Sequence, residues 1–107
     1  MDPLLHADHP LLRGDPRAFD EAFAAFREPV WRFLLRLSGR TEVADELLQE
    51  TFLRLASHAR RLRPDTNLRA WLFTVARNLW RSHRRWAWLD GVRLAELAAQ
   101  AVRGSTP

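Results

Sequence analysis

Apolar residues recur every three or four positions along most of the chain, which is the spacing of helices packed on one side. Asp15 followed by Pro16 predicts the start of the first helix, because proline needs no amide donor there and aspartate accepts from free amides. Pro29 is expected to break or kink this helix, since it lacks an amide hydrogen and clashes with the preceding turn. A second helix then continues to Gly39, which is expected to close it in the left-handed conformation.

The second half of the chain repeats this pattern. Thr41 is predicted to be the N-cap of a long third helix, which ends before a loop over residues 60–67. A fourth helix is expected from about Leu68 to Arg85 or beyond. Its apolar face consists of Leu68, Leu72, Val75, Ala76, Leu79 and Trp86.

No stretch alternates apolar and polar residues as a strand would, so the predicted fold class is all-α, a compact bundle of four main helices. Residues 1–14 are expected to be a flexible leader, and residues 15–88 to form the helical domain. Residues 89–107 are expected to be a linker or a short C-terminal fifth helix capped by Asp90. The predicted core residues are Phe19, Phe23, Phe26, Phe33, Leu34, Leu37, Leu47, Leu48, Leu55, Leu72, Val75 and Leu79.

Composition excludes several classes of function. The chain of 107 residues has the size of one domain, and the absence of cysteine rules out disulfides, thiolate metal sites and cysteine nucleophiles. The four histidines are scattered, and no carboxylate pair, nucleophile motif or glycine-rich phosphate loop accompanies them, so no enzyme, metal or cofactor is expected. Neither a membrane span nor a signal sequence is apparent, which favours a cytoplasmic location.

The net charge of +4 is unevenly distributed along the chain. Residues 54–88 hold nine arginines and a single acid, Asp65. On the fourth helix these arginines share a face with large aromatic rings: Arg69, Phe73, Arg77, Trp80, Arg81, Arg84 and Trp88. Arginine clamps phosphates and exposed rings stack on unpaired bases, so this face predicts a single-strand nucleic-acid surface. In the alternative interpretation, Phe73 and Trp80 pack inside the protein and the arginines only keep it soluble.

A different surface is expected on the third helix. Glu46, Gln49 and Glu50 form an acidic patch next to the apolar Phe52 or Leu53. Such a patch is either an ordinary solvated face or a docking surface for a basic protein partner.

Two runs, in this order, make the chain recognisable. They are ADELLQETFLRL at residues 44–55 and LRAWLFTVARNL at residues 68–79. Together they strongly resemble region two of bacterial sigma factors, and most closely the extracytoplasmic-function (ECF) group. The upstream segments FDEAF at residues 19–23 and PVWRFLLRL at residues 29–37 are similar to the opening helices of that family, so the resemblance covers about residues 15–85.

The resemblance implies a non-catalytic transcription initiation factor with two interfaces. The first docks on the clamp helices of the beta-prime subunit of core RNA polymerase, and its expected residues are Asp45, Glu46, Gln49, Glu50 and Leu53. The second binds the non-template strand of the promoter −10 element, through a loop that captures an extruded base and through the fourth helix. Its expected residues are Arg60, Arg61, Arg63, Asn67, Arg69, Trp71, Phe73, Arg77, Asn78, Trp80, Arg81, Arg84 and Arg85.

The sequence departs from the family in two places. Nothing after Trp88 resembles the C-terminal helix-turn-helix that reads the −35 element, and Trp80, Trp86 and Trp88 stand where smaller or aliphatic residues are expected. Two alternative functions therefore remain open: an interaction module that binds polymerase or an anti-sigma factor without reading promoters, and a stand-alone binder of double-stranded DNA. An anti-sigma factor is an expected partner of both a sigma factor domain and the interaction module.

Overall fold

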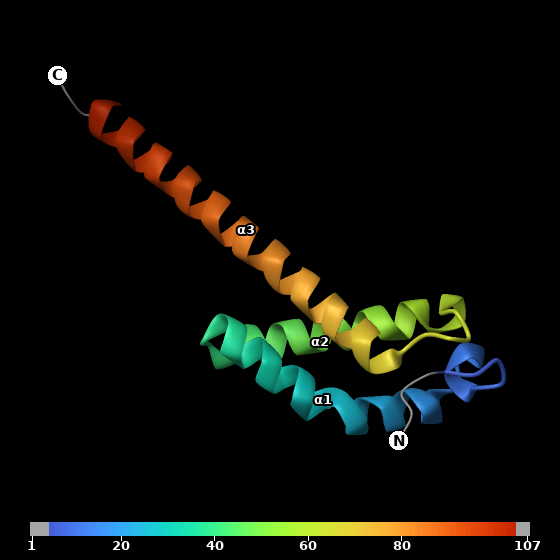
Figure 1. The fold of residues 1–107 in the computed structure, drawn as a ribbon. Helices are drawn as coiled ribbons and strands as arrows, with labels where there is room; N and C mark the ends of the chain where they lie inside the picture. The colour runs from blue at the N-terminus through green and yellow to red at the C-terminus, as the bar shows by residue number, and fades with distance from the viewer. Residues whose placement is uncertain (1–4, 105–107) are drawn as a thin grey trace.

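The computed structural model describes residues 5–104, and the regular elements in this range are helices joined by short turns and loops, with no sheet (Figure 1). Three α-helices, α1 (Pro16–Ser38), α2 (Thr41–His58) and α3 (Leu68–Gly104), pack against one another. Two short 3-10 helices accompany them, η1 (Pro10–Arg13) before α1 and η2 (Ala59–Arg61) after α2. The all-α prediction is confirmed, whereas the predicted number of four main helices is wrong.

Helix α1 begins and ends as the sequence predicts, but Pro29 does not divide it. The Asp15 carboxylate accepts a 2.9 Å hydrogen bond from the Arg17 amide, and Gly39 closes the helix at φ 69°. Pro29 lies inside the continuous helix. It removes only one backbone hydrogen bond, while its neighbour Val30 is fully buried in the core, so tertiary packing maintains the helix through the proline.

Helix α2 starts one residue away from the expected cap. Arg40 has the extended backbone of an N-cap, no side chain caps this end, and Thr41 is the first helical residue. The Thr41 hydroxyl instead lies 3.4 Å from the Glu42 carboxylate. The prediction of Thr41 as N-cap is therefore wrong by one position.

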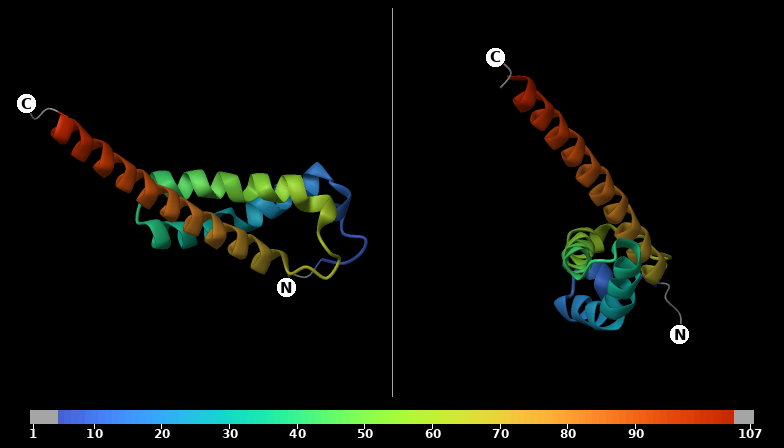
Figure 2. Two further views of the ribbon diagram at one scale, coloured as in Figure 1. Left: turned by 90° about the horizontal axis from the view of Figure 1, so that it is seen from above. Right: turned by 90° about the vertical axis from the view of Figure 1, so that its left-hand side faces the viewer.

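Helix α3 is a single helix of 37 residues and replaces both the predicted fourth helix and the separate fifth one. The Asn67 side chain accepts a 3.0 Å hydrogen bond from the Ala70 amide, as the predicted cap at the end of the loop should. Gly91 costs the helix only about 1 kcal/mol, which the Ala- and Leu-rich sequence around it tolerates. Its C-terminal part leaves the other helices, and the described chain measures 72 × 25 × 20 Å, so the bundle is not compact (Figure 2).

The core lies where the three helices meet. Leu34, Leu47, Leu55 and Leu72 are buried as predicted, and most of the other predicted core residues are partly buried around them. Leu37 was expected in the core but is 37% exposed. Trp86 was expected on the inner face of its helix but is 63% exposed, because α3 has left the bundle by this point.

The segment expected to be a flexible leader makes specific contacts over its described residues, 5–14. Leu5 and Leu11 are buried, and the Leu5 amide donates a 2.8 Å hydrogen bond to the Thr66 carbonyl in the loop before α3. Gly14 turns the chain into α1 at φ 75°, and the guanidinium of Arg60 packs against it. Residues 1–4 of the leader, and residues 105–107 at the other end, lie outside the described range.

None of the helices within residues 5–104 is long and apolar enough to cross a membrane.

Candidate docking and nucleic-acid interfaces

The five residues expected to dock on polymerase share one face of α2. Successive helical residues are about 100° apart, so Asp45, Glu46, Gln49, Glu50 and Leu53 fall within an arc of about 140°. Four of them are exposed and Glu50 is half-buried. Leu53 is 55% exposed, an apolar side chain beside the carboxylates. The structure thus brings the predicted docking residues together on one accessible surface.

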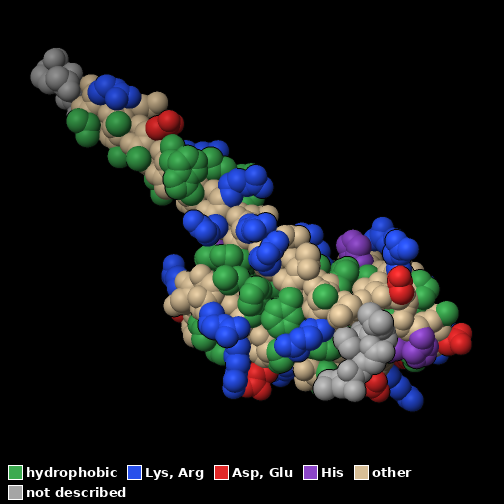
Figure 3. All heavy atoms as spheres, in the orientation of Figure 1, with side chains coloured by type: hydrophobic (Ala, Val, Ile, Leu, Met, Phe, Trp, Pro, Cys, Tyr) green, Lys and Arg blue, Asp and Glu red, His purple; other side chains and the backbone are tan. Residues whose placement is uncertain are grey.

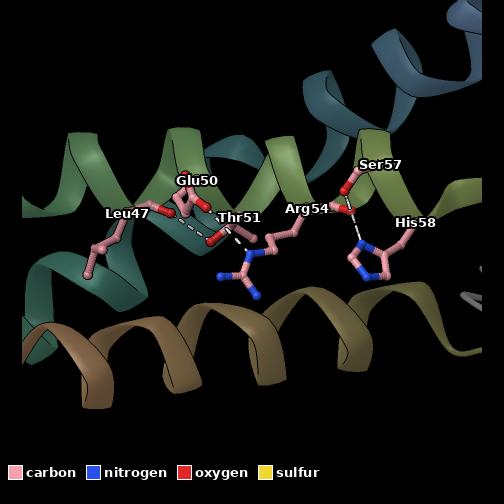
Figure 4. A network of polar contacts seen from close by, with 6 residues as sticks. All are labelled: Leu47, Glu50, Thr51, Arg54, Ser57 and His58. Atoms are coloured by element: carbon pink, nitrogen blue, oxygen red, sulfur yellow. Dashed lines mark hydrogen bonds and ion pairs between the residues drawn. The ribbon is translucent and has the colours of Figure 1, made fainter.

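Two of these carboxylates already have partners within the chain. Asp45 accepts a 2.7 Å hydrogen bond from the indole nitrogen of Trp31 on α1. Glu50 forms an ion pair of 3.4 Å with Arg54 one turn further along α2 (Figure 4). Glu46 and Gln49 make no hydrogen bond or ion pair with any described residue, so their polar groups are available to a partner.

The inner face of α2 is held by its own polar contacts. The buried Thr51 hydroxyl donates a 2.7 Å hydrogen bond to the Leu47 carbonyl, which explains how a hydroxyl is accommodated in the core (Figure 4). At the end of the helix His58 Nδ1 lies 2.9 Å from the Arg54 carbonyl and 3.0 Å from the Ser57 hydroxyl. These contacts lie within α2 itself and satisfy polar groups along the helix that presents the docking face.

An apolar groove of about 450 Å³ lies beside the docking face, between α1 and α2. Phe19 and Phe23 form one wall and contact Phe52 edge-on, with ring centroids 6.3 and 4.9 Å apart. Gln49 and Leu53 line the other side. The sequence assigned Phe19 and Phe23 wholly to the core, whereas both are half-buried and reach the groove. Their exposure in the groove follows from the packing of α1 on α2 and could not be predicted from the sequence of α1 alone.

The predicted DNA-binding residues before α3 are all exposed, but each makes a contact close by. Arg60 packs against Gly14, and Arg61 donates to the Ser57 carbonyl at 3.3 Å. Arg63 pairs with Asp65 at 3.7 Å, and the Asn67 side chain caps α3. The three arginines are exposed to solvent, so their local contacts are weak and can be exchanged for phosphate contacts.

Two aromatic residues of the predicted DNA face on α3 already contact other side chains of the protein. Phe73 is half-buried, meets Phe33 of α1 edge-on at 5.1 Å and carries the Arg69 guanidinium 5.0 Å above its ring. Trp80 is half-buried and stacks on His83 at 5.9 Å. Both rings therefore pack partly against the protein, as the alternative interpretation of this face expected.

The arginines further along α3 have no polar partner among the described residues. Arg77, Arg81, Arg84 and Arg85 are exposed, and none of them forms an ion pair or hydrogen bond with a described residue. Figure 3 shows Arg side chains gathered where α3 leaves the other helices. Four guanidinium groups without partners among residues 5–104 are available for an anionic ligand.

Two predicted residues lie on a different side of α3 from Arg77 and Arg84. Trp71 and Asn78 are seven positions apart and therefore on the same side of α3, about 100° or more from Arg77. Trp71 is half-buried, with its ring 6.4 Å from that of His58, and Asn78 is exposed. The Trp71 ring thus meets the end of α2, whereas Asn78 lies seven positions before Arg85 and shares that side of α3 with it.

Helix α1 adds two cations that the sequence did not single out. Arg32 and Arg36 line an open groove of about 530 Å³ together with Arg69 and Phe73 of α3. Arg32 also pairs with Glu28 at 2.6 Å. Their spacing of four residues indicates that Arg32 and Arg36 share one face of α1. Only the packing of α1 beside α3 brings them next to Arg69.

Comparison with known proteins identifies the class. The family model for sigma-70 region 2 matches residues 22–89, well over half of the chain, so the chain belongs to this family. Members of this family are not enzymes, as the sequence predicted. The described end of α3 after residue 89 lies outside the match.

The similar curated proteins are ECF sigma factors. The chain is 49% identical over 53 residues to the ECF RNA polymerase sigma factor EcfG of Rhodopseudomonas palustris, covering 50% of this chain and 29% of that protein. It is 32% identical over 88 residues to the ECF RNA polymerase sigma factor SigM of Bacillus subtilis, covering 78% of this chain and 53% of that protein. It therefore spans between about a third and a half of these relatives. No solved structure gives a significant match.

Proposed function

We propose that this chain acts as a sigma factor domain that docks on core RNA polymerase and recognises and melts the promoter −10 element. The observation that carries the proposal is the pair of separate, accessible faces on two packed helices. One is acidic and lies on α2, and the other is cationic and lies on α3. Both fall within the region that matches sigma-70 region 2.

The docking half rests on the face of α2 around Gln49. Glu46 and Gln49 offer acceptors that have no partner in the described part of the chain, and Leu53 adds exposed apolar area beside them. A basic helix with apolar anchors suits such a surface, because apolar contacts supply affinity while charges orient the partner. By resemblance to the family, we assign this role to the clamp helices of the beta-prime subunit.

The DNA half rests on the loop before α3 and on the arginines after Phe73. Arg77, Arg81 and Arg84 point along one side of the helix and can follow a phosphate backbone. The loop over residues 60–67 is exposed and is the natural place to hold a base taken out of the stack, which costs a few kcal/mol. Binding the non-template strand in this way would stabilise the melted promoter, and we place this activity in the cytoplasm.

A second candidate function is supported by the groove between α1 and α2. Its aromatic wall of Phe19 and Phe23 suits a protein partner better than DNA, because it is apolar and rimmed by the acids Asp20 and Asp45. A module that binds polymerase or an anti-sigma factor without reading promoters would use this groove and the α2 face alone.

The experiment is fluorescence anisotropy of the chain with a labelled −10-type non-template single strand and with a scrambled strand. Arg77→Ala is expected to weaken binding, and Arg17→Ala, an exposed arginine at the far end of α1, serves as the matched control. Selective binding that only Arg77→Ala weakens supports promoter reading. Equal binding of both strands favours the interaction module.

A further inference from the structure

Trp88 is a large aromatic side chain that is not packed into the helical core. It is 67% exposed and lies on the part of α3 that extends beyond the other helices. An indole with this much apolar surface in water generally marks a contact with something else.

The position of Trp88 on the helix indicates what that contact is. At about 100° per residue, Arg77 and Arg81 lie within about 20° of Trp88, and Arg84 lies within about 40°. The next acid along the chain, Asp90, lies about 160° away, on the opposite side. Trp88 is therefore in line with the unpaired arginines, at the outer end of their row.

The continuous helix also fixes the spacing. Eleven residues separate Arg77 from Trp88, which is about 16 Å along the axis. A stacked strand covers this distance with about five nucleotides, at about 3.4 Å each. One strand can thus contact the arginines with its phosphates and reach the indole with a base.

We propose that Trp88 extends the nucleic-acid face of α3 beyond the bundle by stacking on an unpaired base of the bound strand. The inference rests on the proposed DNA-binding function. It assigns a specific contact to Trp88, which lies on the predicted nucleic-acid face but is not among the DNA-binding residues expected from the family resemblance. A base suits this position better than an apolar protein surface, because the indole's neighbours toward the bundle, Arg84 and Arg85, are cations without partners among the described residues.

The chain supplies a matched control. Trp86 is 63% exposed on the same part of α3, but two residues of rotation place it about 160° from Trp88, away from the row of arginines. Replacing either indole with alanine removes the same chemical group from the same exposed helix. Only the face differs between the two variants.

The test measures binding of the full chain to a fluorescein-labelled dT strand of about 12 nucleotides and to an abasic strand of equal charge, at two salt concentrations. We expect Trp88→Ala to weaken binding to the dT strand roughly fivefold or more, with Trp86→Ala within about twofold of the wild type. The difference should disappear on the abasic strand. Arg77→Ala should weaken binding to both strands and reduce the salt slope by about 0.7.

The possible failures are distinguishable. If Arg77→Ala weakens binding but the two tryptophan variants behave alike, the inference is wrong and the proposed function stands. If Trp88→Ala weakens binding to both strands equally, the contact is with the backbone and stacking is refuted. If the wild type does not bind, or Arg77→Ala binds as tightly as the wild type, the DNA half of the proposed function fails together with the inference. Circular dichroism of each variant verifies that its helices are intact.

Discussion

The indole nitrogen of Trp31 donates a 2.7 Å hydrogen bond to the Asp45 carboxylate, linking the middle of α1 to the first turns of α2. Asp45 is also one of the residues expected to face polymerase. The same carboxylate therefore positions the docking helix and forms part of its surface. A variant at Asp45 changes both, so the docking role is better tested at neighbouring residues that form no bond to another helix, such as Gln49 and Glu50.

Removing this link should destabilise the fold modestly. Trp31→Phe retains most of the ring but loses the donor, and we expect the free energy of unfolding to fall by about 1 kcal/mol. Urea denaturation measures the change. Trp86→Phe, which alters an exposed indole outside the bundle, is the control and should leave stability unchanged. Equal stability of Trp31→Phe and the wild type would show that the bond contributes nothing.

The docking face should be separable from the DNA face. The double variant Gln49→Ala with Glu50→Ala is expected to weaken binding to core RNA polymerase by about 1 kcal/mol or more, roughly fivefold. Binding to a −10-type single strand should stay the same, because these two residues lie on α2 and the proposed strand contacts lie in the loop before α3 and on α3. Biolayer interferometry against immobilised core enzyme provides the first value and anisotropy the second. Unchanged polymerase affinity would refute the assignment of this face.

Two glycines with similar backbone angles should differ in their tolerance to substitution. Gly14 has φ 75° and Gly39 has φ 69°, so alanine is strained at both by about 1 kcal/mol. At Gly14 the added Cβ would also lie 2.5 Å from Nε of Arg60, whereas nothing lies within 4 Å at Gly39. The Arg60 guanidinium is the exposed end of a flexible side chain and can move aside, so Gly14→Ala should lower the thermal midpoint only slightly more than Gly39→Ala. Adding Arg60→Ala should recover only the difference, and a full recovery would mean that the backbone carries no strain.

The projecting end of α3 should contribute little to the stability of the bundle. Between Ala76 and residue 104 no residue is buried, and all residues of this range from Arg84 onward are exposed. Deleting residues 90–107 is expected to reduce the helix signal in circular dichroism while leaving the thermal midpoint within a few degrees. A large, concentration-dependent fall in the midpoint would instead show that this end of the helix is packed against a second molecule in solution.

Local sequence signals predicted the helix ends better than the helix count. Asp15, Gly39 and Asn67 act within a few residues of their own position, and each has the predicted role. The effect of Pro29 depends on the buried Val30 beside it, and the number of helices followed from that tertiary packing. Leu5 is buried because it meets the loop at Thr66, a contact between distant segments that no local pattern encodes.

In the candidate site, too, features within one helix were predictable and features shared by two helices were not. Helical spacing alone placed Glu46 and Gln49 on one exposed face and the arginines of α3 on another, because one helix carries each set. Features shared by two helices were not predictable in this way. The bond from Trp31 to Asp45 and the groove that joins Arg36 to Arg69 depend on how α1 packs against its neighbours.

The most direct test of the central claim is the affinity of a −10-type non-template strand for core RNA polymerase in the presence of this chain. We predict that the wild-type chain gives polymerase a clear preference for this strand over a scrambled one. Arg77→Ala should remain bound to polymerase and lose the preference, whereas the Gln49 and Glu50 double alanine variant should lose it by failing to join the complex. A wild-type complex that binds both strands equally would contradict the account.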